Sequence, residues 1–565
     1  MKSFDTKAPS IHTAIELTNA PIMFQPHSLA TTSKTLRTVF EHLPSVDLRR
    51  LKFEKYVACS LLGLANLSMA YMFQDYTRFF WYLFPLVMIR PLVDIIEITI
   101  IIVSYLVRRL HPPNPKIPAI PENFVYLLCC YNETYQEIMT SLRSLAEQKM
   151  VDAHKKAILV VCDGRASSKG MTKTAAAHLK DDIIERPSSV PMSQAYTAWD
   201  GVPMDAEIIK GEFRGVPIIC IIKNENRGKR DGIVLARSFF HKFNHRDSKP
   251  PLAMMSPRLF AELSDFLEKA SIRSIDYAIG IDADTRFDLE CVSNLIQTVR
   301  EDEKIVGVTG HIRADPIAMG QFSISYLYQN AEYTVGQYRR RLRQNLTSGR
   351  VTCLPGCCQL LRVLESTCGD DILQKFGYYP KPSDGLFRTI RSMMSEDRDH
   401  VCLVLSENAD VQTRVCHRAR AYTTAPQTLS VFLSQRRRWT LGPLTSDSLL
   451  ISRRKTGWME RLAVFTSLLH WVVNPALFFV RFYFKLDRQT KLWLFFLGRY
   501  RNAWDLLVAI LASTSVLDAV QLCIGSMMYS YFIPFVNFVV QFYTLYKLDD
   551  FTWGKTRVGV EARVE

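Results

Sequence analysis

The sequence lacks the features of several classes of protein. Only 24 of its 565 residues are glycine, which excludes a collagen-like fibre. Its 13 cysteines are odd in number and scattered, so they indicate no disulfide framework and exclude a small secreted scaffold. Aromatic residues make up 11% of the chain, too many for a chain that is disordered throughout. Several cysteines lie in apolar runs, which is typical of buried thiols in a reducing compartment (Cys129, Cys130, Cys162 and Cys220).

Three local features are also missing. Residues 1–50 have no apolar core of a signal peptide and are rich in Ser, Thr, Pro and His, so we expect a flexible cytosolic tail. Cys353, Cys357 and Cys358 have no second ligand pair at zinc spacing, which argues against a zinc site. The net charge is +15, from 70 Lys and Arg against 55 Asp and Glu, but no nucleic-acid recognition motif accompanies it. We therefore expect no nucleic-acid partner.

Apolar segments near the start of the chain predict about two membrane helices within residues 51–110. Tyr56 to Phe73 carries no charge and is about long enough to cross the hydrocarbon layer. Phe79 to Val107 is longer and contains Arg90, Asp94 and Glu97 near one helical face. These charges form either an ion pair turned toward a neighbouring helix or a polar lining for something that crosses the membrane. Basic residues follow at once, which places the next segment in the cytosol (Arg108, Arg109 and Lys116).

The second apolar region, within residues 441–548, predicts about three interfacial and transmembrane helices. Leu462 to Val480 is uncharged, and Leu506 to Tyr546 holds the single charge of Asp518. The latter run is long enough for two crossings, with a turn expected at Gly525-Ser526. The basic stretch from Lys485 to Arg501 falls on the outer side in this count. Either Lys491 to Arg501 is therefore an interfacial helix, or the number of crossings differs.

Between these regions, residues 120–440 read as an α/β domain. Short apolar runs recur at 124–130, 157–162, 216–222 and 277–281, and helical patterns such as 135–147 and 291–300 separate several of them. This alternation predicts a largely parallel sheet with helices on both faces. Ligands bind such sheets at the carboxyl ends of the strands, so the residues that follow each run are candidates for the site.

Acidic and basic residues follow these runs. Asp282-Ala-Asp284 follows the fourth run and supplies two carboxylates for a hard divalent cation, and Asp163 follows the second. Lys229 and Arg230 lie in a glycine-containing basic stretch after the third run. That stretch either binds a diphosphate or is a solvated basic loop.

Two further motifs precede the second apolar region. Glu396-Asp397-Arg398 lies in a charged stretch, and Gln435-Arg-Arg-Arg438-Trp439 ends a helical segment. The arginines of the second motif either anchor the chain at the cytosolic membrane surface or bind phosphate, with Trp439 as a platform for a sugar ring. A carboxylate beside Arg398 should stay ionised.

Together these motifs resemble the processive family 2 glycosyltransferases, and the chitin synthases most closely. The resemblance also includes Leu354-Pro-Gly-Cys357 and the tail 549–565, with Asp549-Asp-Phe-Thr-Trp-Gly-Lys-Thr-Arg557. It implies a GT-A (Rossmann-like) cytosolic domain combined with a multi-span transmembrane helical domain. The implied reaction transfers N-acetylglucosamine from UDP-GlcNAc to a growing β-1,4 chitin chain, which then crosses the lipid bilayer of the plasma membrane. A homo-oligomer is also possible under this resemblance.

The resemblance assigns roles to twelve residues. Asp397 would be the general base that takes the proton of the acceptor hydroxyl. Asp284, with Asp282, would hold Mg²⁺ or Mn²⁺ on the diphosphate. The nucleotide sugar would contact Tyr131, Glu133, Asp163, Lys229, Arg230 and Asp282. The acceptor and the diphosphate would contact Glu396, Gln435, Arg438 and Trp439.

Two positions depart from the pattern of the resembled family. Ser395 stands where glycine often precedes Glu-Asp-Arg, and His311 stands where a glutamate often follows glycine. They leave open a catalytically silent paralogue that acts as a membrane scaffold or partner. A synthase of another β-linked polymer, such as hyaluronan or cellulose, is the other alternative.

Overall fold

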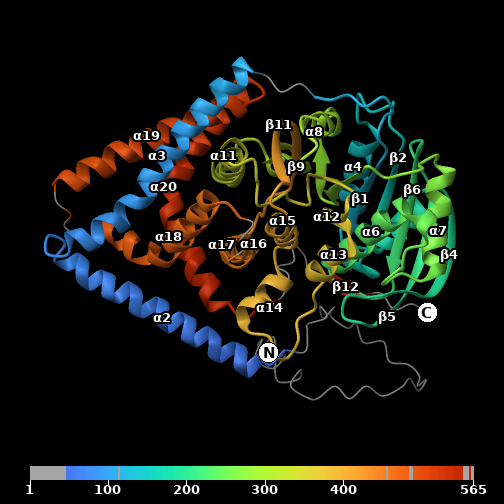
Figure 1. Ribbon diagram of the computed structural model, residues 1–565, viewed down its shortest axis with the longest axis horizontal. Coiled ribbons are helices and arrows are strands. Elements are labelled where there is room, and N and C mark those ends of the chain that lie inside the picture. The colour runs from blue at the N-terminus through green and yellow to red at the C-terminus, as the bar shows by residue number, and fades with distance from the viewer. Residues whose placement is uncertain are drawn as a thin grey trace, which may run out of the picture. The chain divides into compact units, whose positions relative to one another are not determined.

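The protein is described here from a computed structural model (Figure 1). The structure describes residues 46–551, except 112–114, 169–170, 453–455, 483–485 and 487, and also residues 559–561. The expected N-terminal tail and the Trp-Gly-Lys-Thr-Arg motif lie almost wholly outside these residues. All described residues belong to one compact unit, Thr38–Glu565.

Four parallel strands form the centre of a ten-stranded sheet, at the positions expected from the apolar runs. These are β1 (Phe124–Cys130), β2 (Lys156–Cys162), β6 (Val216–Lys223) and β7 (Tyr277–Asp282). The order across the whole sheet is β4-β5-β6-β2-β1-β7-β10-β9-β11-β8. β1 pairs in parallel with both β2 and β7, and β2 pairs in parallel with β6. The carboxyl ends of all four strands therefore meet at one edge.

The flanks of the sheet are mostly antiparallel, unlike the largely parallel sheet that the sequence predicts. β4 (Glu185–Thr197) and β5 (Pro203–Phe213) extend one side, with β5 antiparallel to β6. The other side has β10 (Gln359–Arg362), β9 (Ile305–Ala314), β11 (Gln412–Thr423) and β8 (Thr285–Phe287). Only β9 and β11 run parallel there. β4 is largely exposed, so it lacks the continuous apolar run by which buried strands are recognised.

Helices cover both faces of the sheet, as predicted. Alternate residues of β1 point to opposite faces, so Tyr126 and Leu127 belong to different cores. The core around Tyr126 includes α4 (Tyr135–Ala146) and α8 (Cys291–Val299). The core around Leu127 includes α6 (Lys229–Asn244) and α7 (Pro257–Lys269). The predicted fold class, an α/β domain joined to long apolar helices, is therefore confirmed for its α/β part.

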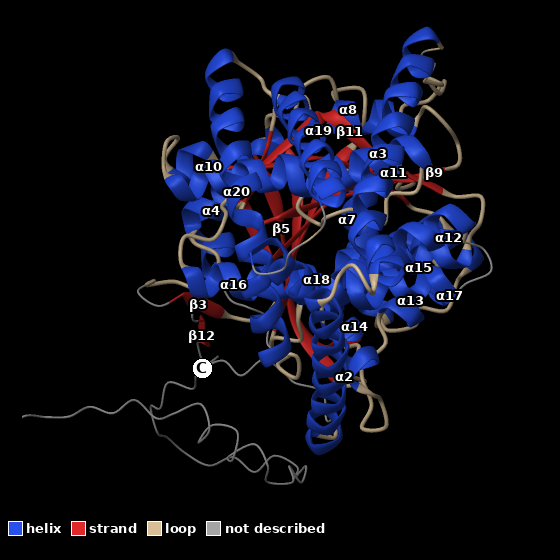
Figure 2. Ribbon diagram, turned by 90° about the vertical axis from the view of Figure 1, so that its left-hand side faces the viewer, coloured by secondary structure: helices blue, strands red, loops and turns tan. Residues whose placement is uncertain are grey.

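Shorter elements complete the domain. β3 (Ala166–Ser168) pairs with β12 (Gly559–Glu561) in a separate two-stranded sheet (Figure 2). The short helical segments are α5 (Ala175–Ala177), η1 (His178–Ile183), η2 (Arg246–Ser248), α9 (Pro316–Met319), α10 (Ile324–Ala331), η3 (Glu332–Tyr338), α11 (Arg339–Thr347), α12 (Glu365–Cys368), α13 (Asp370–Phe376), α14 (Leu386–Met393), α15 (Glu396–Glu407), α16 (Leu429–Gly442), η4 (Pro443–Asp447) and α17 (Ser448–Ser452).

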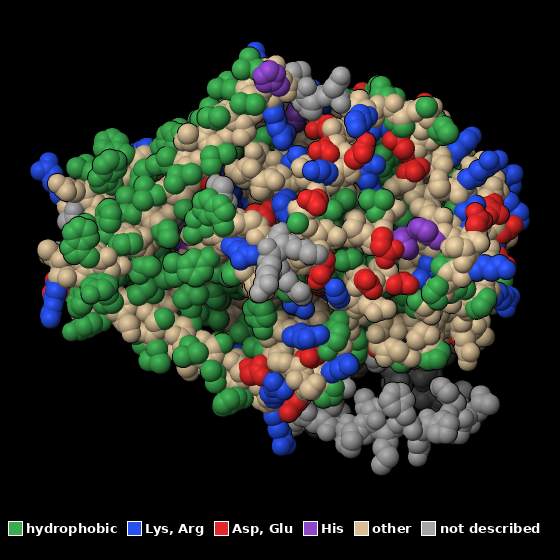
Figure 3. Space-filling view, in the orientation of Figure 1, with side chains coloured by type: hydrophobic (Ala, Val, Ile, Leu, Met, Phe, Trp, Pro, Cys, Tyr) green, Lys and Arg blue, Asp and Glu red, His purple; other side chains and the backbone are tan. Residues whose placement is uncertain are grey.

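In the part of the chain that the structure describes, five long helices make up the apolar part of the molecule. They are α2 (Leu48–Gln74), α3 (Phe80–Leu110), α18 (Trp458–Phe482), α19 (Arg488–Ala512) and α20 (Val516–Tyr546). Within the described residues, three helical segments are long and apolar enough to cross a membrane: Leu48–Gln74, Glu460–Phe479 and Val516–Tyr546. Hydrophobic side chains gather on the face of the molecule over the long helices (Figure 3).

The turn expected at Gly525-Ser526 is not there, because α20 is one continuous helix. The chain turns instead between α19 and α20, at residues 513–515. Gly525 packs against the backbone of Leu327 in α10, so closely that a side chain would collide with the Leu327 carbonyl. The small residues at this point therefore allow two helices to approach each other. Residues 488–501 of the basic stretch that could not be placed from the sequence form the first part of α19, and Lys485 lies outside the described residues.

Candidate active site

A cavity of about 400 Å³ opens at the carboxyl ends of the central strands. It is bounded by the segments that follow β1, β2, β6 and β7, and by α15 and α16. All twelve residues singled out in the sequence line it: Tyr131, Glu133, Asp163, Lys229, Arg230, Asp282, Asp284, Glu396, Asp397, Gln435, Arg438 and Trp439. Residues more than 300 positions apart in the chain are thus brought to one site.

Lys229 lies among three carboxylates at the floor of this cavity. Its Nζ is 2.6 Å from Asp282 Oδ1 and 3.5 Å from Glu396 Oε1. Burial alone would lower the pKa of Lys229, but the charges of Asp282, Asp397 and Glu396 outweigh it and raise the pKa well above its usual value. The ammonium group therefore stays charged and holds the ends of β7 and α15 together.

Asp284 lies beside Asp282, among other carboxylates. Burial raises the pKa of Asp284, and the nearby charges of Asp282, Glu133 and Glu137 raise it further. Two carboxylates at a strand end suit Mg²⁺ or Mn²⁺, which bind proteins through one or two carboxylates and take other ligands from phosphate and water. The described residues hold no cluster of three or more His, Cys, Asp or Glu side chains suited to a metal, so phosphate or water oxygens would have to complete a cation site at this pair.

Asp397 presents a carboxylate to the cavity from the first turn of α15. Burial, followed by the charge of Glu396, raises its pKa to about 7, and Lys229 opposes this effect. Its Oδ1 atom is buried and has no hydrogen-bond partner of good geometry in the part of the chain that the structure describes, although the nearby Gly356 backbone lowers the pKa of the carboxyl group. Such an acceptor can receive the hydrogen of a substrate hydroxyl group.

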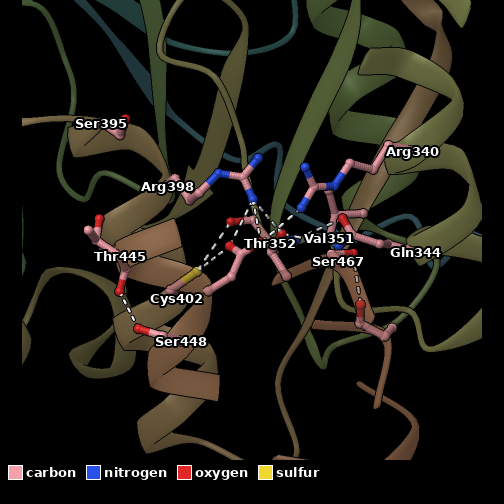
Figure 4. A network of polar contacts seen from close by, with 12 residues as sticks. Arg340, Gln344, Val351, Thr352, Ser395, Arg398, Cys402, Thr445, Ser448 and Ser467 are labelled. Carbon is pink, nitrogen blue, oxygen red and sulfur yellow. Dashed lines mark hydrogen bonds and ion pairs between the residues drawn. The ribbon is translucent and has the colours of Figure 1, made fainter. Parts of the chain in front are cut away.

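The prediction that Arg398 keeps Asp397 ionised is wrong. Arg398 turns away from Asp397, and its Nη1 donates to Asp447 Oδ1 at 2.8 Å and to Thr352 Oγ1 at 3.0 Å (Figure 4). Successive helical residues point about 100° apart, so adjacent side chains do not face each other. Lys229, which is distant in sequence, supplies the positive charge near Asp397 instead.

The arginines of α16 have three different environments. Arg436 pairs with Glu332 at 2.5 Å and lies over the ring of Trp439 at 4.1 Å. Arg437 is buried, and its Nη1 donates to the Lys547 carbonyl at 3.2 Å. Only Arg438 joins Gln435 and Trp439 in the cavity wall. The motif thus combines packing inside the fold with groups that face the site.

The opposite wall carries the residues expected to contact the nucleotide. Lys223 is fully buried and bridges Asp163 and Asp231, at 2.6 and 2.8 Å. Glu133 Oε2 accepts a hydrogen bond of 2.6 Å from the Tyr131 N–H. These contacts fix the polar side chains at the ends of β1 and β2.

Arg230 lines the same cavity, but its guanidinium is bonded within the fold. Its Nη1 donates to Asp399 Oδ2 at 2.8 Å and to the Phe376 carbonyl at 2.9 Å. Its Nη2 donates to the Arg391 carbonyl at 3.1 Å. The resemblance implies that Arg230 contacts the nucleotide sugar, but its guanidinium group instead connects α6 to α15.

The two unusual positions have different surroundings. His311 lies outside the cavity lining, stacks on Tyr338 and is kept neutral because burial holds its pKa well below the usual value. A carboxylate at this position would therefore not have faced the cavity. Ser395 precedes α15 in the left-handed region, with φ 56° and ψ 50°, where glycine is favoured. Its Oγ donates to the Arg438 carbonyl at 3.0 Å.

Part of the cavity wall was not identified from the sequence. Tyr333, Gln337, Arg340 and Arg341 reach it from η3 and α11. They belong to no short motif, and a run of basic residues near apolar segments is easily read as a membrane anchor. Trp199, between β4 and β5, was missed as well.

Sequence comparison identifies the family to which this cavity belongs. The family model for chitin synthase matches residues 208–563. A chitin synthase 8 of Gibberella zeae is 35% identical over 534 residues, which cover 92% of this chain and 79% of that protein. The chain belongs to the chitin synthase family. A chitin synthase 8 of Verticillium dahliae is also 35% identical, over 80% of this chain and 78% of its own length. The family resemblance inferred from the motifs is confirmed, and chitin synthases are glycosyltransferases.

Solved structures offer a more distant comparison. A mannosyltransferase of Pyrobaculum calidifontis, solved in complex with GDP-Man and Mn²⁺, aligns over 81% of this chain and 95% of its own. The TM-score is 0.37 and the sequence identity is 12%. This likeness is too low to carry an argument. The α/β class of the catalytic domain is therefore assigned from the strand order of the protein's own sheet.

Proposed function

We propose that this chitin synthase transfers N-acetylglucosamine from UDP-GlcNAc to the end of a growing β-1,4-linked chitin chain. The observation that carries the proposal is the placement of Asp397. Its buried Oδ1 has no hydrogen-bond partner of good geometry among the described residues, and it faces the cavity that also holds Asp282 and Asp284. A base for the acceptor and an acidic pair for the donor therefore share one site, in a member of the chitin synthase family.

The donor half of the site is formed by the strand ends. Tyr131, Glu133 and Asp163 would contact the nucleoside, and Lys229 would lie beside the diphosphate. Asp282 and Asp284 would hold Mg²⁺ or Mn²⁺, which when bound would neutralise part of the charge of the leaving UDP. Arg438 would donate hydrogen bonds to the same diphosphate from the opposite wall.

The acceptor half is formed by α15 and α16. Asp397 would take the proton of the acceptor 4-hydroxyl as that oxygen attacks the anomeric carbon, and UDP would leave from the opposite side of the sugar. This displacement inverts the configuration and gives a β-linkage. Trp439, stacked under Arg436 and 5.4 Å from Tyr333 between ring centroids, would carry the acceptor sugar on its face.

The long apolar helices extend the proposal to the membrane. Three segments of the described chain can cross a bilayer by length and composition, and α16, which carries Gln435, Arg438 and Trp439, packs against one of them, α20. We infer that the chain is integral to the plasma membrane, with the catalytic domain in the cytosol, and that the polymer crosses between these helices.

The test is product analysis with purified full-length protein in lipid nanodiscs. UDP-GlcNAc, UDP-glucose and UDP-glucuronic acid are offered separately with Mg²⁺ or Mn²⁺, and the products are treated with chitinase. We expect UDP release and a chitinase-sensitive polymer with UDP-GlcNAc alone. A chitinase-resistant polymer would indicate a different glycan, and no polymer from any donor would contradict the proposal.

A further inference from the structure

One face of α11 is bonded to the segments that surround Asp397. Arg340 and Gln344 are four residues apart and therefore lie on the same side of this helix. Arg340 Nη2 donates to Asp447 Oδ2 at 2.9 Å (Figure 4). Gln344 Nε2 donates to Thr352 Oγ1 at 3.1 Å, and Gln344 Oε1 accepts from the Thr352 N–H at 3.2 Å.

The adjoining face of α11 is bonded to the long apolar helices. Arg343 Nη1 lies 2.5 Å from Glu97 Oε2 in α3. Arg339, four residues earlier, pairs with the buried Asp505 in α19. A helix of nine residues therefore connects the surroundings of the catalytic carboxylate to two helices of the apolar part.

Asp447 is the centre of the contacts on the catalytic side. Its side chain is only 3% exposed, and it accepts hydrogen bonds from both Arg398 and Arg340. Arg398 directly follows Asp397 in α15. One buried carboxylate thus holds two guanidinium groups, one from the catalytic helix and one from α11.

Arg398 also connects α15 to the loop that packs against Asp397. Arg398 also donates to Thr352 Oγ1, at 3.0 Å. Thr352 begins the loop that leads to Gly356, and a side chain on Gly356 would come 2.7 Å from Asp397 Oδ1. The helix that carries Asp397 and the loop that packs against it are therefore tied together through Arg398, and Arg398 is held by Asp447.

From this arrangement we propose that Asp447 is a positioning residue for Asp397, and that α11 transmits the arrangement of α3 and α19 to it. The inference rests on the proposed function, in which Asp397 is the base. Removing the charge of Asp447 would take from the buried guanidinium group of Arg398 the carboxylate with which it pairs. Arg398 would then shift and displace the first turn of α15, whereas the nucleotide wall on β1 and β2 would stay in place.

The first test compares Asp447→Asn with the wild type, as full-length protein in nanodiscs. We expect kcat for polymer synthesis to fall at least tenfold, because small displacements of a catalytic group are costly. The KM for UDP-GlcNAc and the Kd for UDP should stay within twofold. Asp518→Asn is the matched control, since Asp518 is also a buried partner of an arginine, Arg313, but lies outside the cavity lining. Its kcat should change less than twofold.

The second test concerns transmission through α11 and remains informative if Asp447→Asn does not fold. Glu97→Gln removes the charge that Arg343 pairs with in α3, and we expect kcat to fall at least threefold with an unchanged KM. In the double variant with Asp447→Asn, the fold-decrease in kcat should be smaller than the product of the two single decreases. The reason is that both substitutions act on Asp397 through the same contacts of α11.

The outcomes separate the two proposals. A wild-type protein that makes no polymer would overturn the proposed function and the inference together. An active wild type with an unchanged kcat in folded Asp447→Asn would overturn the positioning role alone. An unchanged kcat in Glu97→Gln, or losses that multiply fully in the double variant, would overturn transmission through α11.

Discussion

Gly356 packs against the carboxylate of Asp397 so closely that a methyl group in its place would lie 2.7 Å from Asp397 Oδ1. The same methyl group would lie 3.2 Å from Lys229 Nζ. The glycine of the Leu354-Pro-Gly-Cys357 motif is therefore required by the groups it touches, which are the proposed base and the ammonium group beside it.

Gly356→Ala should displace Asp397 or Lys229 and lower the rate of UDP release at least tenfold. UDP binding, measured by calorimetry, should weaken much less, because Tyr131 and Asp163 are not touched. Gly63→Ala is the control: nothing lies within 4 Å of a side chain added there, so activity should not change. An equal decrease in the rate of UDP release in both variants would show that crowding at Asp397 does not cause the decrease in Gly356→Ala.

The pH dependence follows from the environment of Asp397. Burial and the charge of Glu396 raise its pKa to about 7, so a growing fraction is protonated, and inactive as a base, as the pH falls through this value. Synthesis should therefore rise with pH through neutrality and then level off. Lys229→Met removes the charge that lowers this pKa, so the rising part of the profile should move to higher pH. A profile that is flat through neutrality in the wild type would contradict the assignment.

The effects of substitutions at Ser395 and Gly442 on stability should depend on each other. An alanine at position 442 would place its methyl group 2.7 Å from Ser395 Cβ and also against Ser395 Oγ, whereas its next neighbour, Arg398 Cδ, is 3.7 Å away. Gly442→Ala alone should lower the melting temperature by several degrees and reduce activity. Combined with Ser395→Gly, which removes the colliding side chain, it should be tolerated.

Ser395→Gly alone should be nearly neutral. It loses the hydrogen bond to the Arg438 carbonyl, about 1 kcal/mol, but relieves a left-handed conformation that costs about the same for a non-glycine residue. Additive destabilisation in the Ser395→Gly/Gly442→Ala double variant would contradict this coupling.

Dependence on a divalent cation gives a further prediction. Chelation should abolish synthesis by the wild type, and Mg²⁺ or Mn²⁺ should restore it. Asp284→Asn should raise the cation concentration needed for half-maximal rate at least tenfold, because it removes one of two carboxylate ligands. Asp370→Asn, whose carboxylate pairs with Lys242 outside the cavity lining, is the control. An unchanged cation requirement in Asp284→Asn would place the cation elsewhere.

The central strands and the site residues at their ends could be predicted because local sequence determines them. The run 124–130 is buried throughout its length except at Cys129, and Asp282 ends β7 while Asp284 lies two residues beyond it. What the sequence did not predict depends on contacts between distant segments. The pairing of Arg398 with Asp447 and the continuity of α20 through Gly525 both depend on neighbours far along the chain. Neither feature produces a periodic pattern in the sequence from which it could be predicted.

The most direct test of the central claim is Asp397→Asn in purified full-length protein, with polymer synthesis and UDP binding measured on the same preparation. Asparagine keeps the size of the side chain but cannot accept the proton of the acceptor hydroxyl. The proposed role predicts that the chitinase-sensitive polymer formed from UDP-GlcNAc disappears while the Kd for UDP stays within a few-fold of the wild type. Normal polymer synthesis by Asp397→Asn would contradict it.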